Sequence, residues 1–319
     1  MTLKYIQIET TTTCNQRCNF CPVSVAKRPK QTMSLAVVDK IISSLRAYNI
    51  EKVFVNGFNE PTYDKQLVEK VRRLHDAGFS VDLNTNGSGL TPKLTKDLLQ
   101  NGVVSFTINI STLDATEYLE TRGNLDIKRV IPHIEYLLEQ KLSQKFDVIL
   151  LILGHLDKQH GINIQSIAKQ FAGSSAQILI CPIADFAAGA TQILSKDVYH
   201  KTLRGCVSER QNQWLHFTPD GSAILCCQDY FEQYKIGNIA EETVTDIHQG
   251  EQINQLRRWI SGEEVAPEDF ICRSCVFAIS DETYAQKIKK MFCDRCVLPN
   301  MLGIENACQR CAINSYLSV

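Results

Sequence analysis

Three closely spaced cysteines near the start of the chain limit what it can fold into more than any other feature. Cys14, Cys18 and Cys21 have the spacing C-x3-C-x2-C and follow a short strand-like run, Lys4–Ile8. Three thiolates on so short a loop can bind three irons of a cubic 4Fe–4S cluster but cannot reach the fourth. The open iron is then free to bind another molecule. A zinc site or a disulfide-linked loop on the same cysteines is the alternative.

This loop resembles that of the radical SAM superfamily. The resemblance implies that the open iron binds the amino and carboxylate groups of S-adenosylmethionine (SAM). One electron from the cluster would then cleave a carbon–sulfur bond and release a 5′-deoxyadenosyl radical. Phe20, directly before the third cysteine, matches the aromatic residue that is usual there and packs near the adenine. The flanking residues therefore favour an iron–sulfur cluster over zinc or a disulfide.

Composition places the chain among soluble globular proteins that contain metal. Its 319 residues are 44% hydrophobic and 22% charged, and the net charge of −1 gives no sign of a nucleic-acid partner. The longest apolar run, Val148–Leu153, is too short to span a bilayer, and the N-terminus does not read as a signal peptide. Thirteen cysteines in such a chain indicate metal sites in a reducing compartment, so we expect a cytoplasmic protein.

Strand-like and helical patterns alternate from residue 4 to about residue 181. The expected strands are Lys4–Ile8, Lys52–Val55, Ser80–Leu83, Val104–Ile110, Phe146–Leu153 and Gln177–Ile180. The expected helices are Leu35–Tyr48, Lys65–His75, Pro92–Gln100, Ile127–Glu139 and Asn163–Phe171. This alternation predicts an α/β fold with a parallel sheet and helices outside it. Six units fit a partial (β/α)6 TIM-like barrel, as in radical SAM enzymes, with the chemistry at the carboxyl ends of the strands.

Residues typical of SAM binding follow these strands in order. The run Asn56–Pro61 resembles the family's glycine-rich turn ending in Glu-Pro, with asparagine at its fourth position where the family more often has glycine. The resemblance implies that Glu60 accepts hydrogen bonds from the SAM ammonium group. It further implies that Asn86 belongs to a Thr-Asn-Gly turn at the site, that Ser111 contacts the SAM ribose or carboxylate, and that Arg122 pairs with the carboxylate.

Cys181 directly follows the sixth expected strand, at the mouth of the barrel. A lone cysteine is usually a small buried hydrophobic residue. The position also suits a catalytic donor of a hydrogen atom to a substrate radical. The run from Cys181 to Gly189 departs from the turn that is usual in related chains, so we expect the substrate to bind there.

Four further cysteines indicate a second metal centre. They are Cys206, Cys226, Cys272 and Cys275. Their spacing, C-x14-G-x4-C followed by C-x2-C, resembles the SPASM/twitch auxiliary-cluster domain, which implies a closed 4Fe–4S site that does not bind SAM. Structural zinc is the alternative. Cys227 points away from Cys226 on an extended strand, so we expect it not to be a ligand.

The C-terminal tail carries two C-x2-C knuckles. They are formed by Cys293, Cys296, Cys308 and Cys311. Two such knuckles are typical of a zinc ribbon, and the tail resembles the small ribbons attached to some sugar amidotransferases. A further iron–sulfur cluster, or recruitment of Cys293 or Cys296 to an auxiliary cluster, is the alternative. We expect a barrel in residues 1–200, a SPASM/twitch domain in 201–280 and this tail in 281–319.

The resemblance implies a radical SAM oxidoreductase that abstracts hydrogen from an unactivated C–H bond. The relatives either modify peptides and proteins or oxidise small molecules such as aminocyclitols. The first expected strand begins at residue 4, so we expect no peptide-recognition domain before it, and a single twitch-type cluster favours sugars. Peptide modifiers nevertheless dominate this branch, and the cysteine-rich tail adds surface. We therefore expect oxidative modification of a ribosomally made peptide or protein side chain.

Two other functions remain open. One is dehydrogenation or epimerisation of a sugar or aminocyclitol. The other is a non-enzymatic iron–sulfur electron carrier or redox sensor, which would not need the SAM-binding residues. As partners we expect a peptide or small polar metabolite and an electron donor such as flavodoxin or ferredoxin, with no nucleic acid and no membrane.

Overall fold

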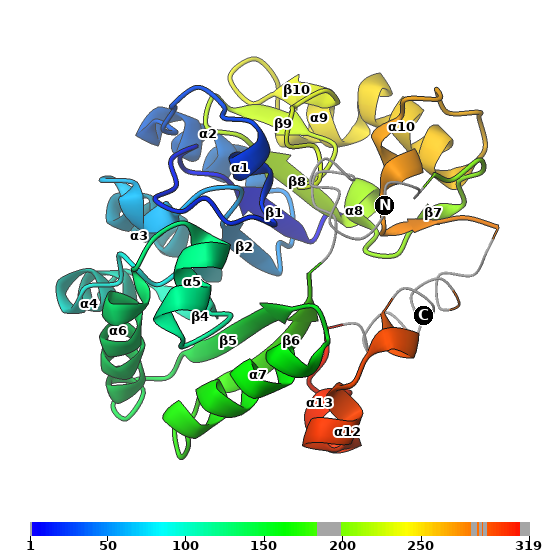
Figure 1. Cartoon of the computed structure of the whole chain (residues 1–319). Coiled ribbons are helices and arrows are strands. Elements are labelled where there is room, and N and C mark those ends of the chain that lie inside the picture. Colours follow the sequence, from blue (N-terminus) through cyan, green and yellow to red (C-terminus); the bar gives the residue numbers. More distant parts are fainter. Residues whose placement is uncertain (1, 184–198, 282–285, 287–288, 290–291, 313–319) are drawn as a thin grey trace.

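A nine-stranded sheet organises the computed structural model, which describes residues 2–183, 199–281, 286, 289 and 292–312 (Figure 1). The strand order is β10-β9-β8-β1-β2-β3-β4-β5-β6. The bounds are β1 Tyr5–Ile8, β2 Lys52–Val55, β3 Val81–Thr85, β4 Val103–Asn109, β5 Asp147–Gly154, β6 Gln177–Pro182, β8 Trp214–Phe217, β9 Ser222–Ile224 and β10 Lys235–Asn238. Strands β8 and β1 to β6 pair in parallel, and β9 and β10 join in antiparallel pairs. The sheet ends at β10 and β6 and is therefore open.

Helices cover the outer face of the parallel strands, as the alternating pattern predicted. The helices of this region are α1 Pro22–Val25, α2 Leu35–Leu45, η1 Pro61–Tyr63, α3 Leu67–Asp76, α4 Pro92–Gln100, α5 Ala115–Arg122, α6 Ile127–Gln140 and α7 Lys158–Gln170. The core lies between these helices and the sheet; α2 buries Val38, Ile41, Ile42 and Leu45 in it. The predicted partial barrel is confirmed, with six parallel strands in the expected order.

Local sequence signals place several helix ends. Ser34 caps α2 by accepting a hydrogen bond from the backbone N–H of Val37, and Thr91 caps α4 in the same way. Helix α5 was not predicted, because its sequence ATEYLETR has few apolar residues. Its ends were nevertheless marked: Asp114 caps it, and Gly123 ends it with φ +74°.

Strands β8 to β10, from the part of the chain after residue 199, continue the same sheet, whereas β7 Gly205–Cys206 and β11 Ala278–Ile279 pair with each other in a separate two-stranded sheet. The helices of this region are α8 Arg210–Gln213, α9 Val244–Gln249, α10 Glu251–Ser261 and η2 Ile271–Ser274. A hairpin turn at Pro219–Gly221 joins β8 to β9, and Gly221 adopts φ +86° there. Helices α9 and α10 are separate because the extended backbone of Gly250 lies between them. Parallel pairing of β8 with β1 fuses this region to the barrel.

The C-terminal tail packs on the last barrel unit. It contains η3 Cys293–Arg295, α12 Leu298–Leu302 and α13 Ile304–Ala307, which lie beside β6 and α7 in Figure 1. The backbone N–H of Ile180 in β6 donates a hydrogen bond to Arg310 O, and Ile180 O accepts one from the N–H of Ala312, both at 2.7 Å. At Gly161 of α7 an added Cβ would lie 2.6 Å from Met301 Sδ. The tail therefore covers the edge of β6, which would otherwise offer unpaired backbone groups.

Candidate active site and metal centres

The loop that carries the first three cysteines is fixed to helix α5. Arg17 N–H donates to Arg122 O, and Asn19 N–H donates to Thr121 O, both at 3.0 Å. Cys21 N–H donates to Cys18 O at 2.9 Å, which turns the loop back on itself. Burial raises the pKa of Cys14 and of Cys21 to about 12, so both thiols are neutral at pH 7 until a metal replaces their protons.

The three thiols line one cavity of about 350 Å³ with the carboxyl ends of the barrel strands. Its lining consists of Cys14, Gln16, Cys18, Phe20, Cys21, Val23, Asn56, Gly57, Phe58, Asn59, Glu60, Asn84, Thr85, Asn86, Thr107, Asn109, Arg122, Leu151, Leu153 and Cys181. The predicted residues Phe20, Glu60, Asn86 and Arg122 are thus brought together with the cysteines. Open α/β sheets place their ligands at this edge.

Glu60 joins the loops that follow β2 and β3. Its carboxylate accepts hydrogen bonds from the hydroxyls of Thr62 and Thr85 and from the backbone N–H of Asn86, each at 2.6 Å. Burial raises the pKa of Glu60, and these hydrogen bonds oppose the increase. Asn86 in turn donates from Nδ2 to Asn15 Oδ1 at 2.9 Å, which ties the cysteine loop to the same frame.

Two asparagines of the turn after β2 have buried amide atoms without partners among the described residues. These atoms are Asn56 Oδ1 and both amide atoms of Asn59. Buried polar atoms are nearly always hydrogen-bonded, so unpaired ones facing a cavity indicate a polar ligand. Sequence reasoning noted Asn59 as a departure from glycine and assigned Asn56 no role. Their position after a strand was the available signal.

Arg122 brings a buried positive charge to the cavity. It is 2% exposed, and its Nη2 donates to Ser111 Oγ at 2.5 Å and to Asn109 Oδ1 at 2.8 Å. Its Nη1 lies 3.6 Å from Cys18 Sγ, and the guanidinium carbon lies 4.9 Å from the Phe20 ring centroid. No carboxylate among the described residues pairs with it. Ser111 therefore reaches the site through Arg122.

Cys181 also lines the cavity, and a tail cysteine lies beside it. Cys181 packs with Cys18, Phe20 and Leu153 in a small buried cluster. The backbone of Cys311 pairs with that of Ile180. The thiols of Cys181 and Cys311 lie close enough to interact electrostatically. Burial, and then Cys311, raises the pKa of Cys181 to about 12. The expected substrate run continues into residues 184–189, which lie outside the described residues.

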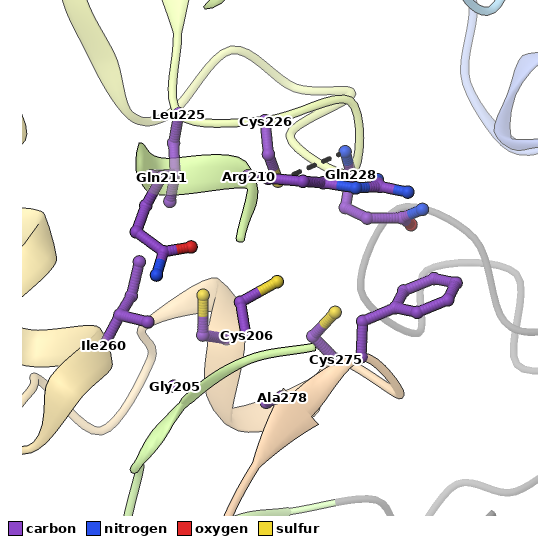
Figure 2. Close-up of a pocket in the computed structure, with 12 residues that line it drawn as sticks. Gly205, Cys206, Arg210, Gln211, Leu225, Cys226, Gln228, Ile260, Cys275 and Ala278 are labelled. Atoms are coloured by element: carbon purple, nitrogen blue, oxygen red, sulfur yellow. Dashed lines mark hydrogen bonds between the residues drawn. The ribbon is translucent and has the colours of Figure 1, made fainter. Parts of the chain in front are cut away.

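The four SPASM-type cysteines surround a second pocket. Figure 2 shows Cys226 facing Cys206 and Cys275 across it, and Cys272 is a further lining residue. Burial raises the pKa of Cys226 and of Cys272 well above the usual range. Apolar side chains, among them Leu225, Ile260 and Phe277, complete the lining.

Cys227 lies next to this pocket but not in its lining. Its thiol accepts a hydrogen bond from Arg210 Nη1 and interacts electrostatically with Cys206. Arg210 itself lines the pocket, and its guanidinium carbon lies 5.2 Å from the Phe277 ring centroid. This arrangement supports Cys226, rather than Cys227, as the ligand.

The tail cysteines divide into two locations. Cys293 interacts electrostatically with Cys296 and Cys308, whereas Cys311 lies at β6 beside Cys181. Cys311 N–H donates to Cys308 O at 3.2 Å, so the second knuckle bridges the two locations. In the described ranges no three Cys, His, Asp or Glu side chains are grouped as a formed metal-binding set.

Sequence comparison identifies both cysteine regions. The radical SAM superfamily matches residues 8–161, and an iron–sulfur cluster-binding domain, SPASM, matches residues 206–276. The chain belongs to the radical SAM superfamily. Radical SAM domains bind a 4Fe–4S cluster and SAM, and SPASM domains bind auxiliary iron–sulfur clusters. No helix within the described ranges is long and apolar enough to cross a membrane.

Curated relatives match the radical SAM chain over part of their length. The tungsten-containing aldehyde ferredoxin oxidoreductase cofactor-modifying protein of Pyrococcus furiosus is 24% identical over 156 residues, which are 46% of this chain and 44% of the relative. A probable GTP 3′,8-cyclase of Pyrococcus abyssi is 28% identical over 176 residues, 54% of each chain. The radical SAM chain thus spans about half the length of these relatives.

Solved structures share the fold at low sequence identity. Streptococcus suis SuiB bound to precursor peptide SuiA gives a TM-score of 0.66 at 13% identity, covering 86% of this chain and 70% of SuiB. Native anSMEcpe with bound AdoMet gives a TM-score of 0.61 at 14% identity, and the match covers 95% of this chain and 99% of anSMEcpe. BtrN in complex with AdoMet and 2-DOIA gives a TM-score of 0.55 at 17% identity, and the match covers 82% of this chain and 89% of BtrN.

The residues of this radical SAM chain fit the cofactors of its family. Three thiols face the cavity for iron, and the unpaired atoms of Asn56 and Asn59, with the buried cation of Arg122, suit a zwitterionic ligand. When bound, the cluster held by Cys14, Cys18 and Cys21 would cleave SAM and supply a 5′-deoxyadenosyl radical. Arg122 and the two asparagines are the groups of this chain that would face the charged part of such a ligand.

Proposed function

We propose that this radical SAM enzyme cleaves SAM reductively and oxidises an unactivated C–H bond in a side chain of a ribosomally made peptide or protein. The buried guanidinium of Arg122 carries the SAM part of the proposal. Burying a cation without a carboxylate to pair with it is energetically costly. Arg122 is buried and lines the cavity that holds Cys14, Cys18 and Cys21. An anionic ligand group at that place, the SAM carboxylate, removes the cost.

The auxiliary pocket supports an oxidative outcome. Its four cysteines, Cys206, Cys226, Cys272 and Cys275, line one pocket. If all four bind one cluster as thiolates, no iron of that cluster has an open position. A closed iron–sulfur site accepts electrons rather than binding a substrate. It would take the second electron of a two-electron oxidation from the substrate radical.

Two structural neighbours support a peptide substrate. SuiB was solved bound to precursor peptide SuiA, and anSMEcpe was solved with bound AdoMet and the Cp18Cys peptide. The second candidate function is dehydrogenation of a sugar or aminocyclitol. It is supported by BtrN, solved with AdoMet and 2-DOIA, because the shared fold covers 89% of that chain. A neighbouring gene for a short precursor peptide would favour the first candidate, and a set of sugar enzymes the second.

The decisive experiment for SAM cleavage replaces Cys14, Cys18 and Cys21 together with alanine. Wild type and variant are reconstituted anaerobically with iron and sulfide, reduced with dithionite and assayed for 5′-deoxyadenosine. We expect the wild type to form it and the triple variant to form none above background. Cys227→Ala is the matched control and keeps the activity. Formation at the wild-type rate by the triple variant would show that the catalytic cluster lies elsewhere.

A further inference from the structure

A second cavity adjoins the cysteine loop on its other side. It has a volume of about 250 Å³, and Cys14, Gln16 and Val23 line both this cavity and the cavity of about 350 Å³ that the proposed function assigns to SAM, here called the SAM cavity. The cysteine loop is therefore the wall between the two. The remaining lining comes from Thr12, Thr13, Arg17, Lys27, Arg28, Lys30 and Tyr230. Four of these side chains are cationic.

The positive charge around this second cavity is concentrated and largely uncompensated. Residues 10–38 contain four basic and no acidic residues, in a chain whose net charge is −1. Arg28 forms ion pairs with Glu9 at 2.6 Å and with Glu232 at 3.4 Å. Arg17, Lys27 and Lys30 are exposed, and none of them forms an ion pair with another described residue. We call these three residues the basic face.

The basic face stands on a fixed backbone. Thr12 N–H donates to Gln31 O at 3.0 Å, and the Thr12 hydroxyl donates to Pro29 O at 2.8 Å. Arg28 stacks on Tyr230 with its guanidinium carbon 4.7 Å from the ring centroid. The segment that carries Lys27 and Lys30 is thus held against both the cysteine loop and the SPASM region. Its charges are presented at a defined place beside the catalytic cysteines.

We propose that the basic face is the docking surface for an acidic one-electron donor protein of the flavodoxin or ferredoxin type. The inference rests on the proposed function, which requires an external electron for each SAM cleavage. The substrate must lie in the SAM cavity, where the radical forms, so an anionic partner on the opposite side of the loop does not compete with it. Clustered charge of one sign steers an oppositely charged partner and orients it.

The chemistry at this surface is electron transfer alone. One electron leaves the reduced redox group of the donor protein and enters the centre held by Cys14, Cys18 and Cys21. The donor is oxidised by one electron, and no atom, proton or covalent bond is exchanged across the surface. Cys14 lines both cavities, so it gives the electron a short path from the second cavity to the catalytic centre.

The test compares two double variants of the reconstituted enzyme. Lys27→Glu/Lys30→Glu reverses charge on the basic face. Lys93→Glu/Lys96→Glu makes the same change on the exposed side of α4 and serves as the matched control. Binding of purified flavodoxin is measured by calorimetry at low and high salt. Formation of 5′-deoxyadenosine is measured with reduced flavodoxin and, separately, with dithionite.

We expect charge reversal on the basic face to weaken flavodoxin binding at low salt about tenfold or more, and to slow flavodoxin-driven turnover by a similar factor. Dithionite-driven turnover and the control variant should be unchanged. Unchanged flavodoxin binding would overturn the proposal. Displacement of flavodoxin by inorganic phosphate at constant ionic strength would also overturn it, because the cavity would then be a small-anion site.

Two further results separate this proposal from others. An equal loss of dithionite-driven turnover, also in the milder Lys27→Gln/Lys30→Gln variant, would assign these lysines to the folding of the cysteine loop and reject the docking surface. Absence of dithionite-driven 5′-deoxyadenosine in the wild type would reject the proposed function instead. Flavodoxin binding would still be measurable in that case, so the two failures are distinguishable.

Discussion

At the scale of single residues, Arg122 shows how the protein is prepared for a ligand. Its Nε is buried without a partner among the described residues, while both terminal nitrogens are held by Ser111, Asn109 and Cys18. The guanidinium is thus fixed before the ligand arrives. Because its orientation is already fixed, little conformational entropy is lost on binding.

The first prediction concerns this arginine. Arg122→Lys keeps the charge but removes the planar fork, so we expect SAM affinity to fall about tenfold or more, a loss of about 1.4 kcal/mol. Anaerobic equilibrium dialysis with SAM measures it, with Arg129→Lys on α6 as the control. Equal SAM affinity in the Arg122 variant would show that the arginine does not contact the ligand.

The second prediction uses Cys181 to distinguish reaction types. An oxidised product loses two hydrogens and gains none, whereas an epimerised product takes up one hydrogen from a thiol that exchanges with solvent. We expect turnover in D2O to give a product without added deuterium. Cys181→Ala should retain most activity, as a packing change of about 1 kcal/mol. Deuterium in the product that disappears in Cys181→Ala, while 5′-deoxyadenosine still forms, would make Cys181 the hydrogen donor.

Most residues of the candidate site were predictable because they follow strands in a fixed order. Glu60, Asn86 and Arg122 were expected at the SAM site and line its cavity with the three cysteines. The unpaired amide atoms of Asn56 and Asn59 were not predicted, since whether a buried amide lacks a partner depends on packing that sequence does not show. The proximity of Cys311 to Cys181 was not predicted for a related reason, because Cys311 reaches Cys181 only through tertiary pairing with β6.

At the scale of elements, the helices and strands that bury an apolar face were predicted closely. Helix α4 has the expected bounds, Pro92–Gln100, because a threonine cap and a proline mark its start. Helix α5 was missed because it buries only Tyr118 and Arg122. An element that serves the site rather than the core carries little apolar periodicity.

The third prediction concerns the contact between α7 and α12. Gly161→Leu adds a side chain where a Cβ alone would meet Met301, so we expect the tail to be displaced at a cost of about 1 to 3 kcal/mol. Hydrogen exchange of residues 292–312 should increase, while the barrel strands stay protected. Met301→Ala in the same chain creates space and should restore protection. Unchanged exchange in the single variant would show that this contact does not hold the tail.

At the scale of the whole molecule, strands β8 to β10 of the SPASM region extend the barrel sheet at one end, and the tail covers the edge of β6 at the other. Pairing of β8 with β1 places the auxiliary pocket at one end of the sheet order, and pairing of Cys311 with Ile180 places the tail at the other. Sequence reasoning found each region from its cysteines. It did not show the pairing between regions, because strand partners distant in sequence leave no local pattern.

The fourth prediction counts the metals in this assembly. If Cys206, Cys226, Cys272 and Cys275 hold one auxiliary cluster and the tail knuckles hold zinc, anaerobically purified protein should contain roughly eight irons and one zinc. Cys308→Ser/Cys311→Ser should then lose the zinc and keep the iron. Cys226→Ser should lose roughly four irons, whereas Cys227→Ser should lose none. Roughly twelve irons without zinc would instead assign a third cluster to the tail, next to Cys181 and the SAM cavity.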